Sequence, residues 1–303
     1  MLEILYEDNH IIVVLKPQNV PSQSDDSGDP DMLTIVKQFL KDKYDKKGNV
    51  FLGLVHRLDR PTGGIMVFAK TSKAASRLSA SLKNGDFSKK YFAVVNGRPR
   101  ENKRILIDYL VKDPETNTVK VVPPSTEGAK RAELSYSVLD SVVTNEGFNL
   151  TLADIELKTG RSHQIRAQFK NMGNPLFGDA KYGGAVIKGE NLSLFAYHLA
   201  FPHPTLNQTM VFRAFPPETA PWTFFNIEKY YNIKIPKNKS IYDQLLPISK
   251  PVVVDFSKPG RDFEYEIDRE IAYSKGEYYL YDREENILRP NDLPYEDQKK
   301  EDN

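Results

Sequence analysis

Residues 54–64 read LVHRLDRPTGG and place one carboxylate, Asp59, between Arg57 and Arg60, directly before a Pro-Thr-Gly-Gly turn. An apolar run at residues 51–55 comes before this loop, and another at residues 65–69 follows it. Both runs are typical of buried strands. The loop is therefore expected to be short, bent and carried by a rigid sheet, where functional side chains are often placed.

The position of Asp59 suits a reacting group. Two neighbouring guanidiniums favour the charged form of a carboxylate, and a nucleophilic carboxylate must be ionised at neutral pH. Glycines at positions 63 and 64 allow the backbone to approach a bound ligand closely. The plainer alternative is a structural ion pair of Asp59 with Arg57 or Arg60. The residues of the loop alone leave both interpretations open.

Composition restricts the class of protein. The 303 residues are 40% hydrophobic and 27% charged, as in ordinary globular proteins, and can form one large domain or two smaller ones. Cysteine is absent, which excludes disulfides, thiolate nucleophiles and cysteine-ligated metals. No apolar run has the length of a membrane span, and residues 1–4 lack signal-peptide features. We expect a cytoplasmic protein.

Charge and texture divide the chain into two regions. Residues 237–303 hold 11 Lys/Arg and 16 Asp/Glu, a net charge of −5, so that residues 1–236 carry +6 of the total of +1. A basic body permits a polyanionic partner, although many enzymes without one are as basic. We expect a catalytic domain at 1–236 and an acidic, aromatic-rich extension at 237–303 of unassigned role, disordered from about residue 294.

The pattern of elements predicts an α+β fold with a central, largely antiparallel mixed sheet flanked by helices and loops. Alternating residues 2–6 and 10–15 form a hairpin, and further strands are expected at 90–95, 132–139, 148–157, 194–201 and 209–215. Helices are expected at about 33–44, capped by Asp31, at 72–82, capped by Ser72, and in a segment opened by residues 159–162 and ended by Gly173. Residues 104–127 show only short β patterns broken by prolines.

A second group of polar residues, KTGRSHQIR at 158–166, stands at a strand-to-helix junction. A helix N-terminus with nearby arginines attracts phosphate, and Arg166 is placed to reach sideways to a buried carboxylate. A solvated basic helix start is an equally good interpretation of these residues taken alone. Tyr91, which follows Lys89 and Lys90, is either a plain strand residue or a stacking platform for a base.

Other catalytic patterns are missing. His198 and His203 lack a third ligand at readable spacing and are expected to be structural. The glycine-rich pieces lack the strand–turn–helix context of a P-loop or dinucleotide fingerprint. There is no serine-nucleophile elbow and no Cys/His pair.

Together these motifs resemble the RluA-type family of RNA pseudouridine synthases. Residues 54–64 are similar to its catalytic loop, and residues 160–166 with GNPLFGD at 173–179 and Tyr182-Gly183 resemble its later motif. Lys90-Tyr91 and FPHP at 201–204 fall in the expected order, so the likeness spans about residues 5–215. The sequence departs from the family at Gly63, where serine is usual. We also expect no separate N-terminal RNA-binding module of the kind that many relatives carry. The region after about residue 240 is not covered.

The resemblance implies a function and a set of roles. Uridines in structured ribosomal or transfer RNA would be isomerised to pseudouridine without cofactor or metal, by a protein that we expect to be a monomer. Asp59 would act on the ribose, by covalent attack or through a glycal-like intermediate, with Arg166 as its charge partner and Tyr91 stacked on the base. Arg57 would fill the space left by the flipped base. RNA contacts would come from the other polar residues of these motifs: His56, Thr62, Lys90, Arg161, His163 and Gln164.

Two alternatives belong to other classes of protein. An RNA-binding module with this fold but no turnover is disfavoured by the intact Asp59, Tyr91 and Arg166. A hydrolase or phosphotransferase with an aspartate nucleophile would need a metal cluster or a second carboxylate beside Asp59, and neither is visible near the loop. The RNA target and the modified positions cannot be inferred from the sequence.

Overall fold

The structure of the chain, a computed structural model, describes residues 2–186, 191–230 and 278–281. Twelve strands of these residues form one sheet, whose main path runs β1-β2-β4-β10-β5-β9-β8-β6-β7. Among the described pairings, β10 with β4 is parallel and the rest are antiparallel. The predicted α+β class with a largely antiparallel sheet is confirmed. Three α-helices accompany the sheet in the described residues.

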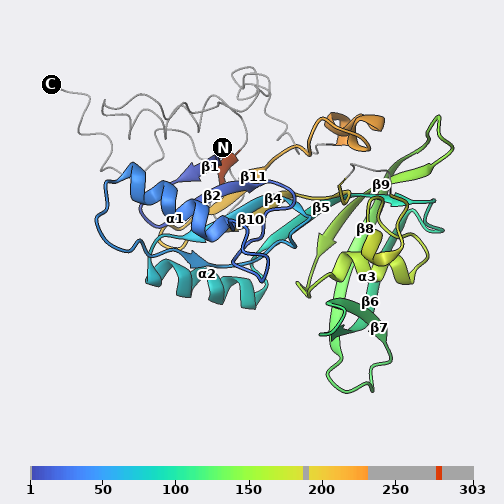
Figure 1. Cartoon of the computed structure of the whole chain (residues 1–303), viewed down its shortest axis with the longest axis horizontal. Coiled ribbons are helices and arrows are strands. Elements are labelled where there is room, and N and C mark those ends of the chain that lie inside the picture. The colour runs from blue at the N-terminus through green and yellow to red at the C-terminus, as the bar shows by residue number, and fades with distance from the viewer. Residues whose placement is uncertain (1, 187–190, 231–277, 282–303) are drawn as a thin grey trace.

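One half of the sheet carries the predicted N-terminal hairpin and the strand that follows the Asp59 loop. Two helices, α1 and α2, lie beside these strands (Figure 1). Asp31 caps α1 by accepting the Thr34 N–H, as predicted, whereas Thr71 rather than Ser72 is the N-cap of α2. The elements of this half are β1 (Glu3–Glu7), β2 (Ile11–Lys16), α1 (Met32–Lys43), β3 (Gly53–Leu54), β4 (Gly63–Ala69) and α2 (Ser72–Asn84).

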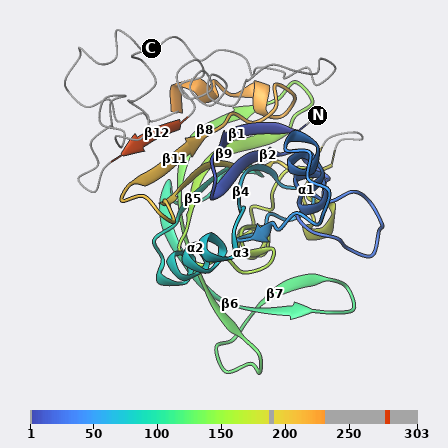
Figure 2. The same ribbon diagram turned by 90° about the vertical axis from the view of Figure 1, so that its left-hand side faces the viewer.

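The other half of the sheet extends away from α1 and α2 and carries α3 (Figures 1 and 2). Its β6–β7 hairpin, formed by the residues whose pattern was irregular in sequence, projects from the body and contacts α3 through β7. The elements of this half are β5 (Ser88–Asn96), β6 (Lys103–Asp113), β7 (Thr118–Val122), β8 (Lys130–Val143), β9 (Asn149–Leu157) and α3 (Gln164–Asn171).

Strand β10 (Leu194–Pro202) joins the two halves because it pairs with β4 on one side and β5 on the other. It also pairs with β11 (Thr209–Arg213), which in turn pairs with β12 (Tyr278–Tyr281). Strand β12 belongs to the predicted C-terminal extension. The expected disorder from residue 294 lies outside the described residues. The remaining elements are short 3₁₀ helices: η1 (Ala180–Tyr182), η2 (Trp222–Phe224) and η3 (Ile227–Tyr230).

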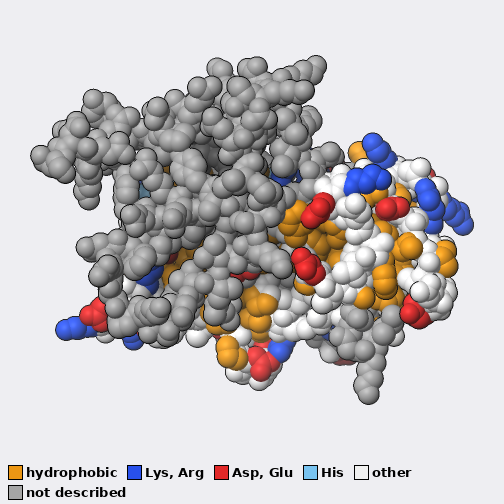
Figure 3. Space-filling model, turned by 90° about the horizontal axis from the view of Figure 1, so that it is seen from above, with side chains coloured by type: hydrophobic (Ala, Val, Ile, Leu, Met, Phe, Trp, Pro, Cys, Tyr) orange, Lys and Arg blue, Asp and Glu red, His pale blue; other side chains and the backbone are white. Residues whose placement is uncertain are grey.

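Apolar side chains fill both faces of the central strands, and two large clusters result. Because both faces are covered, the residues of β4 are buried throughout. The apolar run at 51–55 behaves differently from the prediction: β3 has two residues, and Phe51 is 51% exposed. In the view from above, hydrophobic side chains lie across the described part of the surface, and a group of Lys and Arg side chains lies at its right-hand edge (Figure 3).

None of the described helices has both the length and the apolar character that crossing a lipid bilayer requires.

Candidate active site

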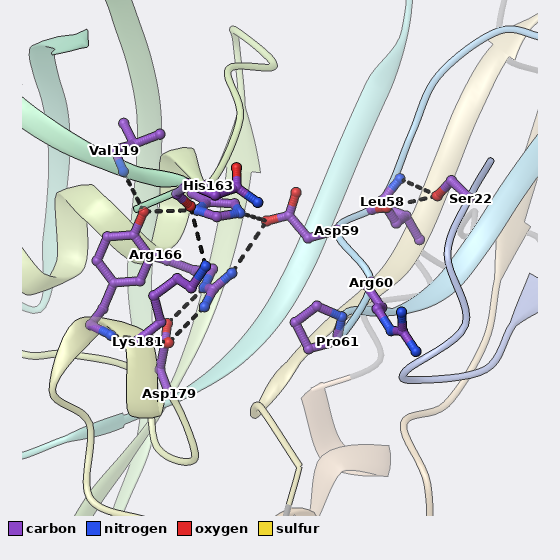
Figure 4. Close-up of polar contacts among 12 residues, drawn as sticks. Ser22, Leu58, Asp59, Arg60, Pro61, Val119, His163, Arg166, Asp179 and Lys181 are labelled. Carbon is purple, nitrogen blue, oxygen red and sulfur yellow. Dashed lines mark hydrogen bonds and ion pairs between the residues drawn. The ribbon is translucent and has the colours of Figure 1, made fainter. Parts of the chain in front are cut away.

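Asp59 lies in the loop between β3 and β4 and faces the start of α3 (Figure 4). A tight turn fixes its backbone, since the Thr62 N–H donates to the Asp59 carbonyl at 2.9 Å. The side chain is 28% exposed, so the carboxylate is partly shielded and still open to a substrate. The loop thus presents one carboxylate from the edge of a rigid sheet.

Residues 16–22 form a segment that makes hydrogen bonds to the backbone of the Asp59 loop. The Lys16 ammonium donates to the Arg60 carbonyl at 3.0 Å and to the carbonyls of Pro17 and Val20 at 2.9 and 2.6 Å. Its three N–H groups therefore have three acceptors. Lys16 is fully buried, and sequence reasoning did not single it out.

The same segment binds the loop at two further points. Ser22 Oγ donates to the Leu58 carbonyl at 2.7 Å and accepts the Leu58 N–H at 3.1 Å. Gln18 Nε2 donates to the Pro61 carbonyl at 3.1 Å. Residues on both sides of Asp59 are therefore held by hydrogen bonds to their main chain, and we call Lys16, Gln18 and Ser22 the backbone clamp.

Burial costs the Lys16 charge part of its hydration and lowers the pKa of this lysine to about 7. The nearby Arg60 charge acts in the same direction, while the Asp59 carboxylate opposes both. The charged form of Lys16 thus depends on Asp59 and on the carbonyl groups that accept hydrogen bonds from its ammonium. The charge of Asp59 therefore also influences Lys16, which binds the backbone of the loop.

Both glycines of the loop have a packing reason. Gly64 has φ +129°, and a Cβ there would lie 2.4 Å from the Ala196 carbonyl, where β4 runs beside β10. At Gly63, a Cβ would lie 3.1 Å from Gln18 Cγ and 3.2 Å from the Phe195 ring. A serine at position 63 would press on Gln18. The departure from the family pattern therefore matches a neighbour that itself binds the loop.

Arg166 faces Asp59 from α3, with Nη1 at 3.8 Å from Asp59 Oδ2. Its closest partner is another carboxylate, Asp179, which accepts hydrogen bonds of 2.7 Å from both Nε and Nη2. Asp179 is 1% exposed and Arg166 5%. The expected pairing of Arg166 with Asp59 is thus a longer contact, added to a buried bidentate pair that the sequence did not predict.

His163 lies close to the Asp59 carboxylate, although the sequence pointed only to an RNA contact for it. It precedes α3 in the left-handed conformation, with φ 48°, and its Nε2 is 3.9 Å from Asp59 Oδ2. Burial lowers the pKa of His163; the Asp59 charge opposes this effect, and the Arg166 charge adds to it. The ring is therefore neutral at neutral pH. The helix that was predicted to open at residues 159–162 begins later, at Gln164.

Tyr91 is buried on β5, on the face that lies toward Asp59. Burial and the Asp59 charge both raise the pKa of Tyr91, so its phenol is protonated at neutral pH. Lys90 points to the opposite face of the sheet, since neighbouring strand residues alternate, and its charge acts on Asp154 and His198 there. Lys90 therefore does not share the face of Tyr91, and its contact with RNA stays a prediction.

Lys89, two residues before Tyr91, shares its face and was missed. Its Nζ would lie 3.5 Å from a Cβ at Gly160, next to the start of the second motif. Burial lowers the pKa of Lys89. The alternation of side chains along a strand, which puts Lys89 and Tyr91 on the same face, was the signal in the sequence that could have identified Lys89.

Two of the residues expected to contact RNA make hydrogen bonds within the protein, and a third is buried. His56 Nε2 accepts the Val67 N–H at 3.1 Å, and burial lowers the pKa of His56 to about 3. In the Gln164 amide, Oε1 accepts from Arg161 N and Thr159 Oγ1, and Nε2 donates to the Glu133 carbonyl. Thr62 is 2% exposed, and its hydroxyl has no partner among the described residues. These side chains shape the site from within.

The arginines of the loop separate in role. Arg57 is exposed, and its guanidinium makes no hydrogen bond or ion pair within the described part of the chain. Arg60 pairs with Asp25 and Asp29, not with Asp59. The structural ion pair considered from sequence is therefore absent for both arginines. Arg161 is exposed at the site's margin, where its Nε donates to the Arg131 carbonyl at 3.1 Å.

His198 and His203 are built into the fold. His203 Nε2 lies 2.7 Å from Asp8 Oδ2, while its Nδ1 accepts the Leu206 N–H at 2.9 Å. Burial lowers the pKa of His198 to about 3. Their positions agree with the structural role predicted for them.

Comparison with known sequences gives one consistent family. The model of the RNA pseudouridylate synthase family matches residues 10–171. The uncharacterized RNA pseudouridine synthase YjbO of Bacillus subtilis is 35% identical over 217 residues, which cover 70% of this chain and 72% of that protein. The tRNA pseudouridine synthase C of Vibrio cholerae is 31% identical over 228 residues, covering 71% of this chain and 91% of the relative.

A ribosomal relative and a solved structure complete the comparison. The ribosomal large subunit pseudouridine synthase D of Zymomonas mobilis is 30% identical over 228 residues, covering 72% of this chain and 70% of that protein. The solved structure of human RNA pseudouridylate synthase domain containing 1 superposes with a TM-score of 0.58 at 23% identity. It covers 72% of this chain and 83% of the human chain, and it shows a shared fold.

Proposed function

The chain belongs to the RNA pseudouridine synthase family, whose members are isomerases that act on RNA, and on this basis we propose that Asp59 carries the isomerisation of particular uridines in structured ribosomal or transfer RNA. The resemblance to the RluA-type family is confirmed. Both RNA classes are proposed because the relatives include a tRNA enzyme and a ribosomal large subunit enzyme.

The proposed reaction moves one bond and one proton. The bond from ribose C1′ to N1 of uracil breaks, the base rotates, and C1′ bonds to C5. The C5 proton is lost and N1 gains a proton, so that atoms and electrons balance without an oxidant or reductant. The protein must therefore supply a group that acts at the sugar, a path for the proton and a space in which the base can turn.

One observation carries the assignment of Asp59. Its partly exposed carboxylate is fixed from behind by the backbone clamp and faces Arg166 and His163 from α3 at 3.8 and 3.9 Å. The Arg166 guanidinium at that distance attracts the carboxylate through space and leaves its oxygens free to act on a substrate. The carboxylate then either attacks C1′ or assists cleavage through a glycal-like intermediate.

Tyr91 suits a role next to the base. Its ring is buried on the face of β5 that lies toward Asp59, and its pKa is raised, so the phenol carries its proton at neutral pH. An aromatic ring that faces the reacting carboxylate offers a stacking surface for a flipped uracil. Because the phenol keeps its own proton at neutral pH, the C5 proton is not assigned to it.

Arg57 suits the role of holding the duplex open. A base must leave its stack before it reaches Asp59, which costs a few kcal/mol. Arg57 is exposed two residues before Asp59, and its guanidinium has no partner among the described residues. It is therefore free to enter the space that the base vacates. Arg161, exposed at the site's margin, is placed to contact phosphate.

The test is incubation of the full chain with ribosomal and transfer RNA lacking the modification, followed by carbodiimide labelling and mapping. We expect specific uridines to be converted by the wild type and none by Asp59→Asn, which keeps shape and loses charge. Asp86→Asn, an exposed aspartate on the turn after α2, is the matched control. Equal, background-level labelling by wild type and Asp59→Asn on both RNA classes would overturn the proposal.

A further inference from the structure

Tyr182, which closes η1, contacts both side chains, Arg166 and His163, that face Asp59 from the start of α3. The Arg166 guanidinium lies 4.8 Å from the centre of the Tyr182 ring. The Tyr182 hydroxyl lies 2.8 Å from His163 Nδ1 and accepts the Val119 N–H at 2.7 Å. The side chain is 3% exposed. This buried phenol thus joins β7 to the two side chains that face Asp59.

The hydrogen atoms at this oxygen can be assigned. A phenol has one proton to donate and accepts through its oxygen. The Val119 N–H already uses the oxygen as an acceptor, and the described residues offer the phenol proton one acceptor, His163 Nδ1. A neutral imidazole that accepts at Nδ1 carries its proton on Nε2. The ring nitrogen that faces Asp59 is then the protonated one.

We propose that Tyr182 is a positioning residue, whose hydroxyl donates to His163 Nδ1 and thereby directs the imidazole's Nε2–H toward Asp59 Oδ2. The inference rests on the proposed function of Asp59 for its catalytic meaning, but the proton position is a property of the protein itself. In the opposite tautomer, a lone pair on Nε2 would face the carboxylate and repel it.

The groups around His163 fit a neutral donor. Asp59 faces Nε2 from the loop after β3, Arg166 lies on α3 itself, and Asp179 and Lys181 approach from η1. The two cations and burial together disfavour a second proton on the ring, against the two carboxylates. At 3.9 Å the Nε2–Oδ2 contact is longer than a hydrogen bond; such contacts often shorten when substrate binds.

Tyr182 also makes the β6–β7 hairpin part of the site. The buried Val119 N–H on β7 would lack a partner without the hydroxyl, and Asp179, the partner of Arg166, accepts the Tyr182 N–H at 3.3 Å. The β6–β7 hairpin is therefore in direct contact with the tyrosine that orients His163.

The experiment is ¹⁵N NMR of the full chain labelled at its five histidines. Protonated and unprotonated ring nitrogens resonate at well-separated ¹⁵N frequencies, and His163→Gln identifies the His163 signals by their loss. We expect wild-type His163 to show a protonated Nε2 and an unprotonated Nδ1, and Tyr182→Phe to show both tautomers. Tyr136→Phe, which removes another buried tyrosine hydroxyl, bonded to the Glu101 carbonyl, is the matched control and should leave His163 unchanged.

Kinetics provide the second measurement. Tyr182→Phe should lower kcat about tenfold or more and change the RNA Kd less than about twofold, because a misplaced group costs rate more than binding. A protonated Nδ1 in wild type, or the same tautomer in wild type and Tyr182→Phe, would overturn the inference. The wild-type spectrum decides this even if Tyr182→Phe does not fold. Absence of RNA turnover in wild type would instead contradict the proposed function, and the spectrum would still decide the position of the His163 proton.

Discussion

The two sides of the site hold Asp59 by different means. On the side of the sheet's N-terminal half, the backbone clamp formed by Lys16, Gln18 and Ser22 binds main-chain groups of the loop. On the side of α3, the Arg166 guanidinium and the neutral His163 ring face the carboxylate itself, and they are held by Asp179 and Tyr182. The first side fixes where the carboxylate lies, and the second fixes which charges surround it.

This difference shows how the Asp59 carboxylate can be fixed in place and still remain accessible to a substrate. Hydrogen bonds to the loop backbone leave both carboxylate oxygens available, since none of them is spent on Asp59 Oδ1 or Oδ2. The Arg166 charge at 3.8 Å and the neutral His163 ring at 3.9 Å act on the carboxylate without a direct hydrogen bond. Variants on the two sides should therefore differ in how stability and turnover change together.

The largest effect is expected for Arg166→Met. It leaves the buried Asp179 carboxylate without its bidentate partner, which should lower the free energy of unfolding by about 3–5 kcal/mol. Turnover should fall by about 10²-fold or more, because a preorganised charge at the site is lost. Urea unfolding and single-turnover isomerisation measure the two. In Arg166→Met/Asp179→Asn, stability should recover and turnover should not; recovery of both would show that Arg166 has a structural role alone.

On the opposite side, Lys16→Met should slow turnover about 10- to 100-fold while RNA affinity changes little, because the Arg60 carbonyl and the loop lose their anchor. Filter binding and single-turnover rates separate the two quantities. Lys70→Met is the matched control, a mostly buried lysine that pairs with Glu7 away from the site. An equal loss of turnover in both variants, measured where both are folded, would contradict the clamp.

Arg57→Ala tests the loop's exposed cation and should have a smaller effect, about tenfold on turnover and less than about threefold on affinity, because unstacking a base costs only a few kcal/mol. Arg100→Ala, which removes an exposed arginine from the turn after β5, serves as control. If Arg57→Ala weakened RNA binding with no change in the rate of bound substrate, the wedge role would be wrong.

The smallest effect concerns pH. In the folded chain the pKa of His56 is about 3, below its ordinary value of 6.5. Between these values the unfolded chain binds a proton that the folded chain does not, so stability should fall as pH is lowered from about 6.5 toward 3. His56→Gln should flatten this slope in urea titrations at several pH values. An unchanged slope would show that His56 is not held neutral by the fold.

Local patterns predicted much of the fold. The N-terminal hairpin, the Asp31 cap and the strand after the Asp59 loop depend on neighbouring residues, and each was predicted from spacing and residue type. The run at 51–55 was overestimated because its apolar residues pack as a loop, with Phe51 turned outward. Local sequence does not reveal which apolar residues find a partner.

The candidate site was predicted in part for the same reason. Asp59, Arg166 and His163 do meet, but the bidentate partner of Arg166 is Asp179, and this pairing cannot be found without the fold. Gln164 was assigned to RNA although its amide closes a turn onto β8, a contact between distant segments. Lys89 could have been preferred to Lys90 from sequence, because the alternation along β5 puts Lys89 on the Tyr91 face.

The central claim is that the charge of Asp59 carries the isomerisation, and the loss of the C5 proton measures it most directly. RNA labelled with tritium at uracil C5 should release its label to water with wild type and with Asp86→Asn. With Asp59→Asn it should release none while the RNA remains bound. Tritium release by Asp59→Asn at the wild-type rate would contradict the account.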